Sequence, residues 1–199
     1  MLEPRTAARR TGVIDTCPAI SVGSKISLRT LPAAARFVLR IPETAIHNLP
    51  SLAGLDISMP INRMSENGSR IAARLGPSEW LLIVPERDAE KFTADLSDQL
   101  SSQYHTVVDI SHRNVAFEVS GTAAAAVINA GCPLNLNDDQ FRIGHATRSL
   151  LGKSEIVLLR LSDSTDERGM TQPRYRIECW RSFGRYLHEF LAEAVRSNR

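Results

Sequence analysis

Three residues close together in the sequence, Asp109, Ser111 and His112, have the side-chain types of a hydrolase catalytic triad. A triad needs its serine, histidine and carboxylate in one hydrogen-bonded line. Here the residues lie in or directly after Thr106–Ile110, a run with the pattern of a strand. Because neighbouring side chains of a strand point to opposite faces, this spacing argues against a catalytic relay. We expect His112 and Arg113 to satisfy a local carboxylate or to lie on a surface that contacts a partner.

A second candidate is Gly152-Lys153-Ser154, which is similar to the end of a phosphate-binding loop. The complete loop has another glycine five residues before Gly152, and Thr147 occupies that position. The loop must also open a helix, so that its backbone N–H groups face the phosphate. Residues 156–159 are instead rich in strand-forming side chains. We therefore predict a tight turn between two strands.

The cysteines and histidines do not have the spacing of a metal site. Cys17, Cys132 and Cys179 are far apart, and none belongs to a C-x-x-C pair. The remaining histidines are scattered, without an H-E-x-x-H motif: His47, His105, His145 and His188. Structural zinc usually takes two close pairs of ligands. We predict three thiols without disulfides, and no metal site on this chain.

Composition sets broad limits on the class of protein. A chain of 199 residues with 43% hydrophobic and 23% charged residues is typical of a globular domain that folds without disulfides or metals. The net charge of +2 is spread along the chain, which argues against nucleic acid as a partner. The apolar runs are far shorter than the roughly 20 residues of a membrane-spanning helix. Without an apolar run near residue 1 to act as a secretory signal, we expect a cytoplasmic protein.

The spacing of apolar residues predicts where the secondary structure lies. Residues 1–25 show no periodicity, so we predict a flexible N-terminal arm and a single domain over 26–199. In the first half we predict four strands and one helix: Ile26–Arg29, Phe37–Ile41, Arg70–Leu75, Trp80–Pro85 and the helix Ala89–Leu100. The Asn67-Gly68 pair predicts a hairpin turn before the third of these strands.

The second half repeats the order of strands followed by a helix. We predict strands at Thr106–Ile110 and Val115–Val119, a helix over Ala123–Ala130 capped by Gly131, and strands at Thr147–Leu161 and Tyr175–Trp180. A solvated loop over 162–173 and a final helix Ser182–Arg196, with Ser182 as its N-cap, complete the chain. Strands and helices in this order predict an α+β fold. Two sub-lobes, 26–103 and 104–199, are the alternative to one undivided domain.

Trp80 and Trp180 are the two tryptophans of the chain, and both lie among apolar residues. Burial in the core is the default interpretation for such residues. Tryptophan and arginine are also enriched at the energetic centres of protein interfaces. At the predicted junction between the last strand and the last helix, Trp180, Arg181 and Phe183 therefore have two open interpretations, plain packing and contact with a partner.

Several short sequences of the second half together resemble one protein family. They are Ser111-His112-Arg113, Gly131-Cys132-Pro133-Leu134, Thr147–Ile156 and Trp180-Arg181-Ser182-Phe183. In this order they resemble the gamma subunits of bacterial heterotetrameric sarcosine oxidase. Val107–Ser111, followed by Val119-Ser120-Gly121 and a short helix, is also similar to the opening motif of the wider aminomethyltransferase family. The resemblance implies the fold of the N-terminal, folate-binding part of that family, with mixed or antiparallel sheets packed with helices.

The resemblance also implies a subunit without an active site of its own. Such a subunit docks on the alpha subunit in a heterotetramer with beta and delta subunits, and the complex oxidises sarcosine with oxygen to glycine, hydrogen peroxide and formaldehyde or 5,10-methylenetetrahydrofolate. FAD, FMN, NAD, tetrahydrofolate and zinc are then expected on the other subunits, and no catalytic, cofactor or metal residue on this one. The candidate interface residues are Trp180, Arg181, Phe183, His112 and Arg113.

Two other functions remain open from the residues. The aminomethyltransferases carry a Gly-Gly turn and a pair of aspartates where this chain reads Leu151–Ile156, with the single acid Glu155. The chain could itself transfer a one-carbon unit on folate, with Glu155 or Asp109 as the acid. Alternatively, it could be a free-standing folate-binding regulatory protein. Tetrahydrofolate binding and the presence of oxidase partners separate these functions.

Overall fold

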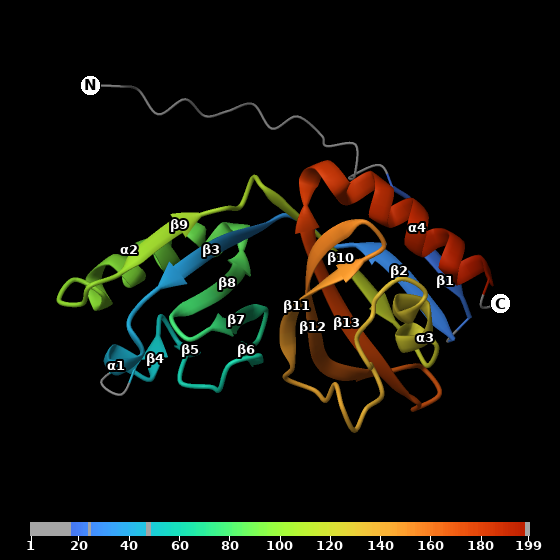
Figure 1. The fold of residues 1–199 in the computed structure, drawn as a ribbon, viewed down its shortest axis with the longest axis horizontal. Coiled ribbons are helices and arrows are strands. Elements are labelled where there is room, and N and C mark those ends of the chain that lie inside the picture. Colours follow the sequence, from blue (N-terminus) through green and yellow to red (C-terminus); the bar gives the residue numbers. More distant parts are fainter. Residues whose placement is uncertain (1–16, 24, 47–48, 198–199) are drawn as a thin grey trace.

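The structure is a computed structural model that describes residues 17–23, 25–46 and 49–197. Two β-sheets lie against each other, and helices cover their outer faces (Figure 1). Every strand pairing among the described residues is antiparallel, so the α+β prediction with antiparallel sheets is confirmed. No helix of the described residues is both long and apolar enough to span a membrane.

The five-stranded sheet has the order β6-β7-β8-β3-β9. Its strands are β3 (Ala34–Arg40), β6 (Arg63–Asn67), β7 (Arg70–Gly76), β8 (Glu79–Pro85) and β9 (Thr106–Asp109). The short elements beside it are α1 (Glu43–Ile46), β4 (Ser51–Leu52), β5 (Leu55–Asp56) and η2 (Glu86–Asp88). Helix α2 (Ala89–Gln99) covers the outer face, because its buried Phe92 and Leu96 share one apolar core with Trp80 of β8. Trp80 is fully buried and donates its indole N–H to the Ile57 carbonyl at 3.0 Å.

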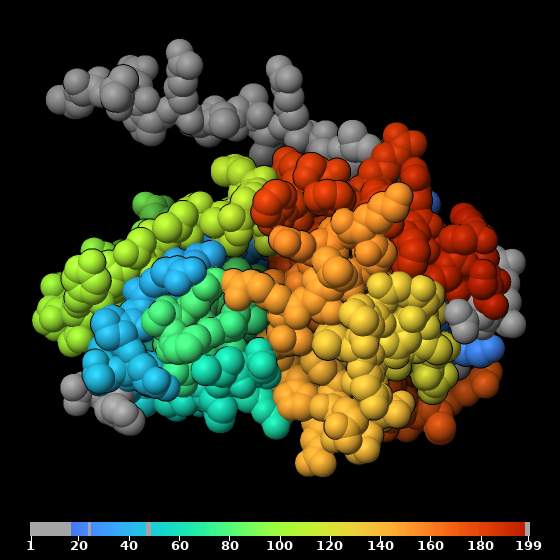
Figure 2. All heavy atoms as spheres, in the orientation of Figure 1, coloured from blue at the N-terminus to red at the C-terminus, as the bar shows by residue number. Residues whose placement is uncertain are grey.

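The six-stranded sheet has the order β1-β2-β10-β13-β12-β11. Its strands are β1 (Ile20–Val22), β2 (Ile26–Thr30), β10 (Asn114–Ser120), β11 (Ala146–Leu151), β12 (Ser154–Thr165) and β13 (Thr171–Trp180). Helices α3 (Ala124–Asn129) and α4 (Gly184–Ser197) pack on its outer face, with the 3-10 helix η3 (Arg181–Phe183) leading into α4. A third apolar core, which includes Leu81 of β8 and Leu159 of β12, joins the inner faces of the two sheets. In the space-filling view, the part of the molecule built on the five-stranded sheet (blue to green) meets the part built on the six-stranded sheet (yellow to red) (Figure 2).

The strands do not divide between the sheets at residue 103. β2 precedes the five-stranded sheet in sequence but pairs with β10 of the six-stranded sheet. Conversely, β9 follows residue 103 in sequence but pairs with β3 of the five-stranded sheet. Each predicted sub-lobe therefore contributes one strand to the sheet of the other, so the boundaries 26–103 and 104–199 do not match the sheets.

The predicted arm over 1–25 was too long at its C-terminal end. Residues 1–16 and 24 lie outside the described residues, but β1 pairs with β2 and so extends the six-stranded sheet. Ile20 and Val22, two residues apart in β1, pack against the core beneath α4. A strand of only three residues is too short for its pattern to stand out in the sequence. His188 of α4 also holds this segment, since its Nε2 donates to the Pro18 carbonyl at 3.0 Å.

Three local predictions in the second half were wrong in detail. The loop predicted over 162–173 is much shorter, because β12 runs to Thr165 and β13 begins at Thr171, beyond a bulge at residues 161–164. Gly131 does not have the positive φ of a glycine that caps a helix end. Its role is steric, because a Cβ at this position would lie 2.5 Å from the Phe190 ring. Ser182 lies inside η3 and is therefore not the N-cap.

Candidate functional site

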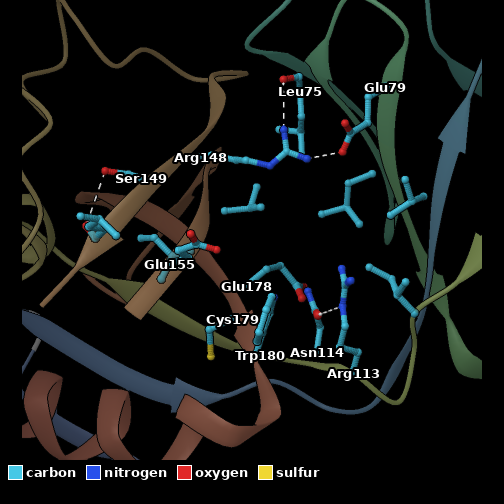
Figure 3. A pocket seen from close by; sticks show the side chains of 16 residues that line it. Leu75, Glu79, Arg113, Asn114, Arg148, Ser149, Glu155, Glu178, Cys179 and Trp180 are labelled. Carbon is cyan, nitrogen blue, oxygen red and sulfur yellow. Dashed lines mark hydrogen bonds and ion pairs between the residues drawn. The ribbon is translucent and has the colours of Figure 1, made fainter. Parts of the chain in front are cut away.

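A cavity of about 330 Å³ opens between the two sheets, beside the core that joins them (Figure 3). From the five-stranded sheet, β3, β7 and β8 contribute Val38, Leu75, Glu79 and Leu81. From the six-stranded sheet, β10 to β13 contribute side chains of four neighbouring strands. Pockets of this size that are mostly apolar, with a few convergent polar groups, are typical binding sites.

The six-stranded sheet presents its cavity residues in rows because the side chains of a strand alternate between faces. Trp180 of β13 lies opposite Asn114 of β10, and Glu178, two residues before Trp180, lies opposite Val157 of β12. Glu155 of β12 lies opposite Leu150 of β11 in the same ladder. Because side chains of a strand alternate between its two faces, all six of these side chains lie on the face that lines the cavity.

Two carboxylates of the cavity are each held by two arginines. Glu178 is fully buried and accepts hydrogen bonds from Arg36 Nε at 2.6 Å and from Arg176 Nε at 2.8 Å. Arg36 belongs to β3, so this buried ion pair joins the two sheets. Glu79 pairs with Arg148 across the joint and with Arg40 at 2.7 Å. Each of these carboxylates therefore connects the two sheets through an ion pair.

The five predicted interface residues lie together at one end of the six-stranded sheet. His112 and Arg113 form the turn between β9 and β10, and Trp180, Arg181 and Phe183 form the junction of β13 and η3. The β10–β13 ladder brings the two segments together, and the Arg181 N–H donates to the Arg113 carbonyl at 2.7 Å. The Arg113 guanidinium lies 5.9 Å from the centre of the Trp180 ring. We call these five residues the junction surface.

The junction surface is exposed rather than packed. Trp180 and Phe183 keep 48% and 36% of their surface accessible, and His112, Arg113 and Arg181 are also exposed. Trp80, by contrast, is buried in the core beneath α2. The default interpretation of a core residue thus holds for Trp80 and not for Trp180. Contact between the junction surface and a partner stays a prediction.

The residues that suggested a triad do not form one. Ser111 donates from its N–H and its Oγ to Asp109 Oδ1 at 2.7 and 2.5 Å, and its Oγ accepts from the Arg36 N–H at 2.9 Å. In the part of the chain that the structure describes, His112 makes no hydrogen bond with either residue. Asp109 and Ser111 therefore fix the bend that follows β9.

Gly152 lies in the turn between β11 and β12, with a φ of +58° that favours glycine. The Lys153 N–H donates to the Tyr186 hydroxyl at 3.1 Å, which ties this turn to α4. The predicted tight turn between strands is confirmed. His47 lies outside the described residues, and among those described no group of three His, Cys, Asp or Glu side chains could hold a metal ion.

Cys179 borders the cavity through β13, but its side chain is buried in the core beneath α4 and is chemically protected. Burial and the charge of Glu178 raise the pKa of its thiol to about 12, against the opposing charge of Arg36. Because the thiolate is the reactive form, we expect no labelling of Cys179 by Ellman's reagent in the folded chain at about pH 8. Mass spectrometry of the labelled protein identifies the modified cysteine, and labelling in denaturant is the control. Rapid modification of native Cys179 would contradict this assignment.

Glu118 of β10 contributes a pH-dependent part of the stability. Burial acts to raise its pKa, but hydrogen bonds from Arg174 and Arg29, together with their charges, hold the pKa below its ordinary value of 4.5. Such a group stabilises the fold above its unfolded pKa, and this stabilisation is lost as the pH falls through the folded pKa. Urea unfolding should therefore show Glu118→Gln less stable than the wild type at neutral pH, with the difference shrinking below 4.5. A difference that stays constant across this range would contradict the ion-pair assignment.

The comparison with known families decides the classification of the chain. The profile of the sarcosine oxidase, gamma subunit family matches residues 43–196, which is most of the sequence. The chain belongs to the sarcosine oxidase gamma subunit family. The resemblance noted in the second half of the sequence is thereby confirmed, and the match extends it toward the N-terminus.

Curated members of the sarcosine oxidase gamma subunit family are distant relatives in sequence. The sarcosine oxidase subunit gamma of Arthrobacter sp. is 26% identical over 166 residues, which cover 80% of this chain and 81% of the relative. The subunit gamma of Corynebacterium sp. strain P-1 is 26% identical over 146 residues, covering 73% and 67% of the two chains. The chain therefore spans most of the length of these relatives.

Two solved structures share the fold of this chain. A chain of heterotetrameric sarcosine oxidase from Corynebacterium sp. U-96, in complex with pyrrole 2-carboxylate, superposes with a TM-score of 0.74 at 22% identity, covering 90% of this chain and 88% of that one. The glycine cleavage system aminomethyltransferase T from Bartonella henselae superposes with a TM-score of 0.64 at 15% identity, over 84% of this chain and 45% of that one. The predicted aminomethyltransferase-like fold is confirmed.

For this member of the family, sequence reasoning missed the ion pairs of the cavity. Arg36 and Glu178 each interrupt an apolar run, within residues 34–40 and 175–180. A charged residue between apolar neighbours in a predicted strand indicates a buried ion pair, since a buried charge needs a partner. That signal was present, but it does not tell which charge pairs with which.

Proposed function

We propose that this chain is the gamma subunit of a heterotetrameric sarcosine oxidase and has no active site of its own. The match of the gamma subunit family over residues 43–196 carries this proposal. Alpha, beta and delta subunits are the proposed partners, with FAD, FMN, NAD, tetrahydrofolate and zinc bound on those subunits. The assembled enzyme is an oxidoreductase that acts on a CH–NH donor with oxygen as the acceptor, in the cytoplasm.

In the proposed reaction, the N-methyl group of sarcosine loses two electrons to oxygen. Water then releases glycine and formaldehyde, or folate takes the carbon as 5,10-methylenetetrahydrofolate, and oxygen leaves as hydrogen peroxide. Three of the four candidate acids are held in structural contacts, which supports a structural role; the fourth, Glu155, is exposed at the cavity and is tested by the folate titration below. Glu178 and Glu79 are neutralised by arginines, and Asp109 is engaged by Ser111. A general acid or base needs a carboxylate that is free to exchange a proton within reach of the substrate.

The junction surface is the proposed contact with the alpha subunit. Exposed tryptophan and phenylalanine beside two arginines have the composition of an interface centre. The ladder between β10 and β13 holds this surface rigid, which lowers the entropic cost of association. The sequence supplies these residues on two segments, and the fold joins them.

Co-expression of the chain with the three companion subunits tests the proposal. We expect all four to co-elute in gel filtration and the complex to release hydrogen peroxide from sarcosine. The chain purified alone should neither release peroxide nor show saturable binding in a tetrahydrofolate titration. Sarcosine oxidation or tight folate binding by the lone chain would contradict the proposal in favour of a folate enzyme. Elution of the chain as a separate species would contradict it in favour of a free-standing protein.

A further inference from the structure

We infer that the mouth of the cavity accepts one basic side chain, an arginine or lysine of a companion subunit, between Trp180 and Glu155. This inference rests on the proposed function, which supplies the partner. It goes further by naming the chemistry of the group that enters and the residues that receive it.

The ladder between β12 and β13 places Glu155 beside Trp180. Ile156 lies opposite Cys179 in that ladder, so the next position outward sets Glu155 across from Trp180. Side chains in such cross-strand positions have Cβ atoms about 4.5–5.5 Å apart and interact directly. Both residues are exposed and both line the cavity. A single group entering the mouth can therefore contact both.

Glu155 differs from the other carboxylates of the cavity in having no ion-pair partner in the described part of the chain. Glu79 and Glu178 are each paired with two arginines. Within residues 17–23, 25–46 and 49–197, the Glu155 carboxylate makes no hydrogen bond or ion pair. The lining arginine Arg148 is committed to Glu79. If a partner covers the mouth, Glu155 loses water and needs a positive group to replace it, because an unpaired buried charge is costly.

Trp180 favours the same kind of occupant. Its ring attracts cations at its faces, and Arg113 lies 5.9 Å from its centre. Figure 3 draws Arg113 and Asn114 to one side of Trp180 and Glu155 to the other. Arg113 also donates to Asn114 Oδ1 at 3.2 Å, which holds the guanidinium on its own side. A second cation on the Glu155 side would gain both a ring contact and a charge-assisted hydrogen bond.

Other occupants fit these residues less well. An acidic side chain would be repelled by Glu155, and an apolar one would cover Glu155 without neutralising it. The cavity behind the mouth is lined by apolar residues, including Val38, Leu81 and Val157, which suit the methylene stem of a long basic side chain. A basic side chain is the occupant that leaves neither Glu155 nor Trp180 without a partner.

The test measures the dissociation constant of this chain from its three companion subunits. It compares the wild type with Glu155→Gln and Glu155→Lys. We expect Glu155→Gln to weaken binding by at least about tenfold at low salt and Glu155→Lys to weaken it further. The difference between Glu155→Gln and wild type should shrink as salt is raised, because salt screens the ion pair. Glu90→Gln, which removes an exposed carboxylate from α2, is the matched control and should bind as wild type does.

Each outcome bears on one claim. If Glu155→Gln weakens binding but the isolated variant unfolds at the same temperature as the wild type, the inference is supported. A folding defect would instead lower both the unfolding temperature and the binding affinity. If Glu155→Gln assembles with wild-type affinity, or with a loss that salt does not reduce, the inference is overturned while the proposed function stands. If the wild-type chain does not assemble at all, the proposed function fails and the inference falls with it.

Discussion

Replacing Glu178 by glutamine should lower the free energy of unfolding by about 3–5 kcal/mol, the usual cost of breaking a buried ion pair. The substitution keeps the shape of the side chain but removes the charge opposite Arg36, whose side chain is only 3% exposed. Arg36 would then stay buried without its counter-charge, while its guanidinium keeps the hydrogen bond to the Ala34 carbonyl at 2.9 Å. Because this pair joins β3 to β13, the loss should loosen the joint between the two sheets. Urea unfolding followed by circular dichroism measures it.

The matched control is Glu193→Gln on α4, where Glu193 pairs with Arg196 at 2.8 Å on the surface. Both side chains of that pair are exposed, and exposed pairs contribute little to stability. We expect this variant to unfold close to the wild type. Equal stabilities for Glu178→Gln and Glu193→Gln would show that the buried ion pair does not hold the sheets together.

The two tryptophans should separate folding from assembly. Trp180→Ala should weaken binding to the companion subunits by about 30-fold or more, as expected for an interface centre worth about 2 kcal/mol. Since Trp180 is 48% exposed, the isolated chain should lose less than about 1 kcal/mol of stability. Trp80→Ala should instead cost about 3–5 kcal/mol of stability, because it empties a fully buried site beneath α2. Binding assays and urea unfolding on the same variants measure the contrast.

Tyr104→Ala controls for the loss of an exposed aromatic residue. Tyr104 is 89% exposed and precedes β9 at the end remote from the junction surface. It should bind the companions as the wild type does. Wild-type binding by Trp180→Ala, or equal weakening by Tyr104→Ala, would rule out the junction surface as the main contact.

The elements that the sequence predicted well have a strong local pattern. The apolar stripe of α2 repeats through Phe92 and Leu96, and that of α4 through Leu187 and Leu191, so each helix could be placed from one stretch of chain. The run that contains Trp80 likewise indicated a buried strand, now β8. In these segments the local spacing and the final packing agree.

The elements that were misjudged depend on distant parts of the chain. Residues 162–165 and 171–173 read as a charged loop, yet they extend β12 and β13 as a paired ribbon. The charged residues gather at its tip, where Asp166 accepts hydrogen bonds from the Arg168 and Met170 N–H groups at 3.0 and 2.8 Å. The pairing of β2 with β10 is equally remote in sequence. Periodicity cannot reveal which strands become neighbours.

The candidate site was predictable only in part for the same reason. The five residues of the junction surface could be named from the sequence by their types, but only the β10–β13 ladder shows that their two segments meet. The cavity could not, because it needs the register of four strands and the approach of the other sheet. Glu155 was singled out for its place in a family motif. That Glu155 lies beside Trp180 follows only from the register of β12 and β13, and that its carboxylate has no ion-pair partner in the described part of the chain follows only from the structure.

Hydrogen exchange of the chain, alone and in the four-subunit complex, tests most directly whether the junction surface is where this subunit docks. We predict that assembly slows exchange of the backbone amides at residues 111–114 and 180–183. Those of α2, on the outer face of the five-stranded sheet, should exchange at the same rate in both states. Protection of α2 with no change at the junction surface would contradict the account.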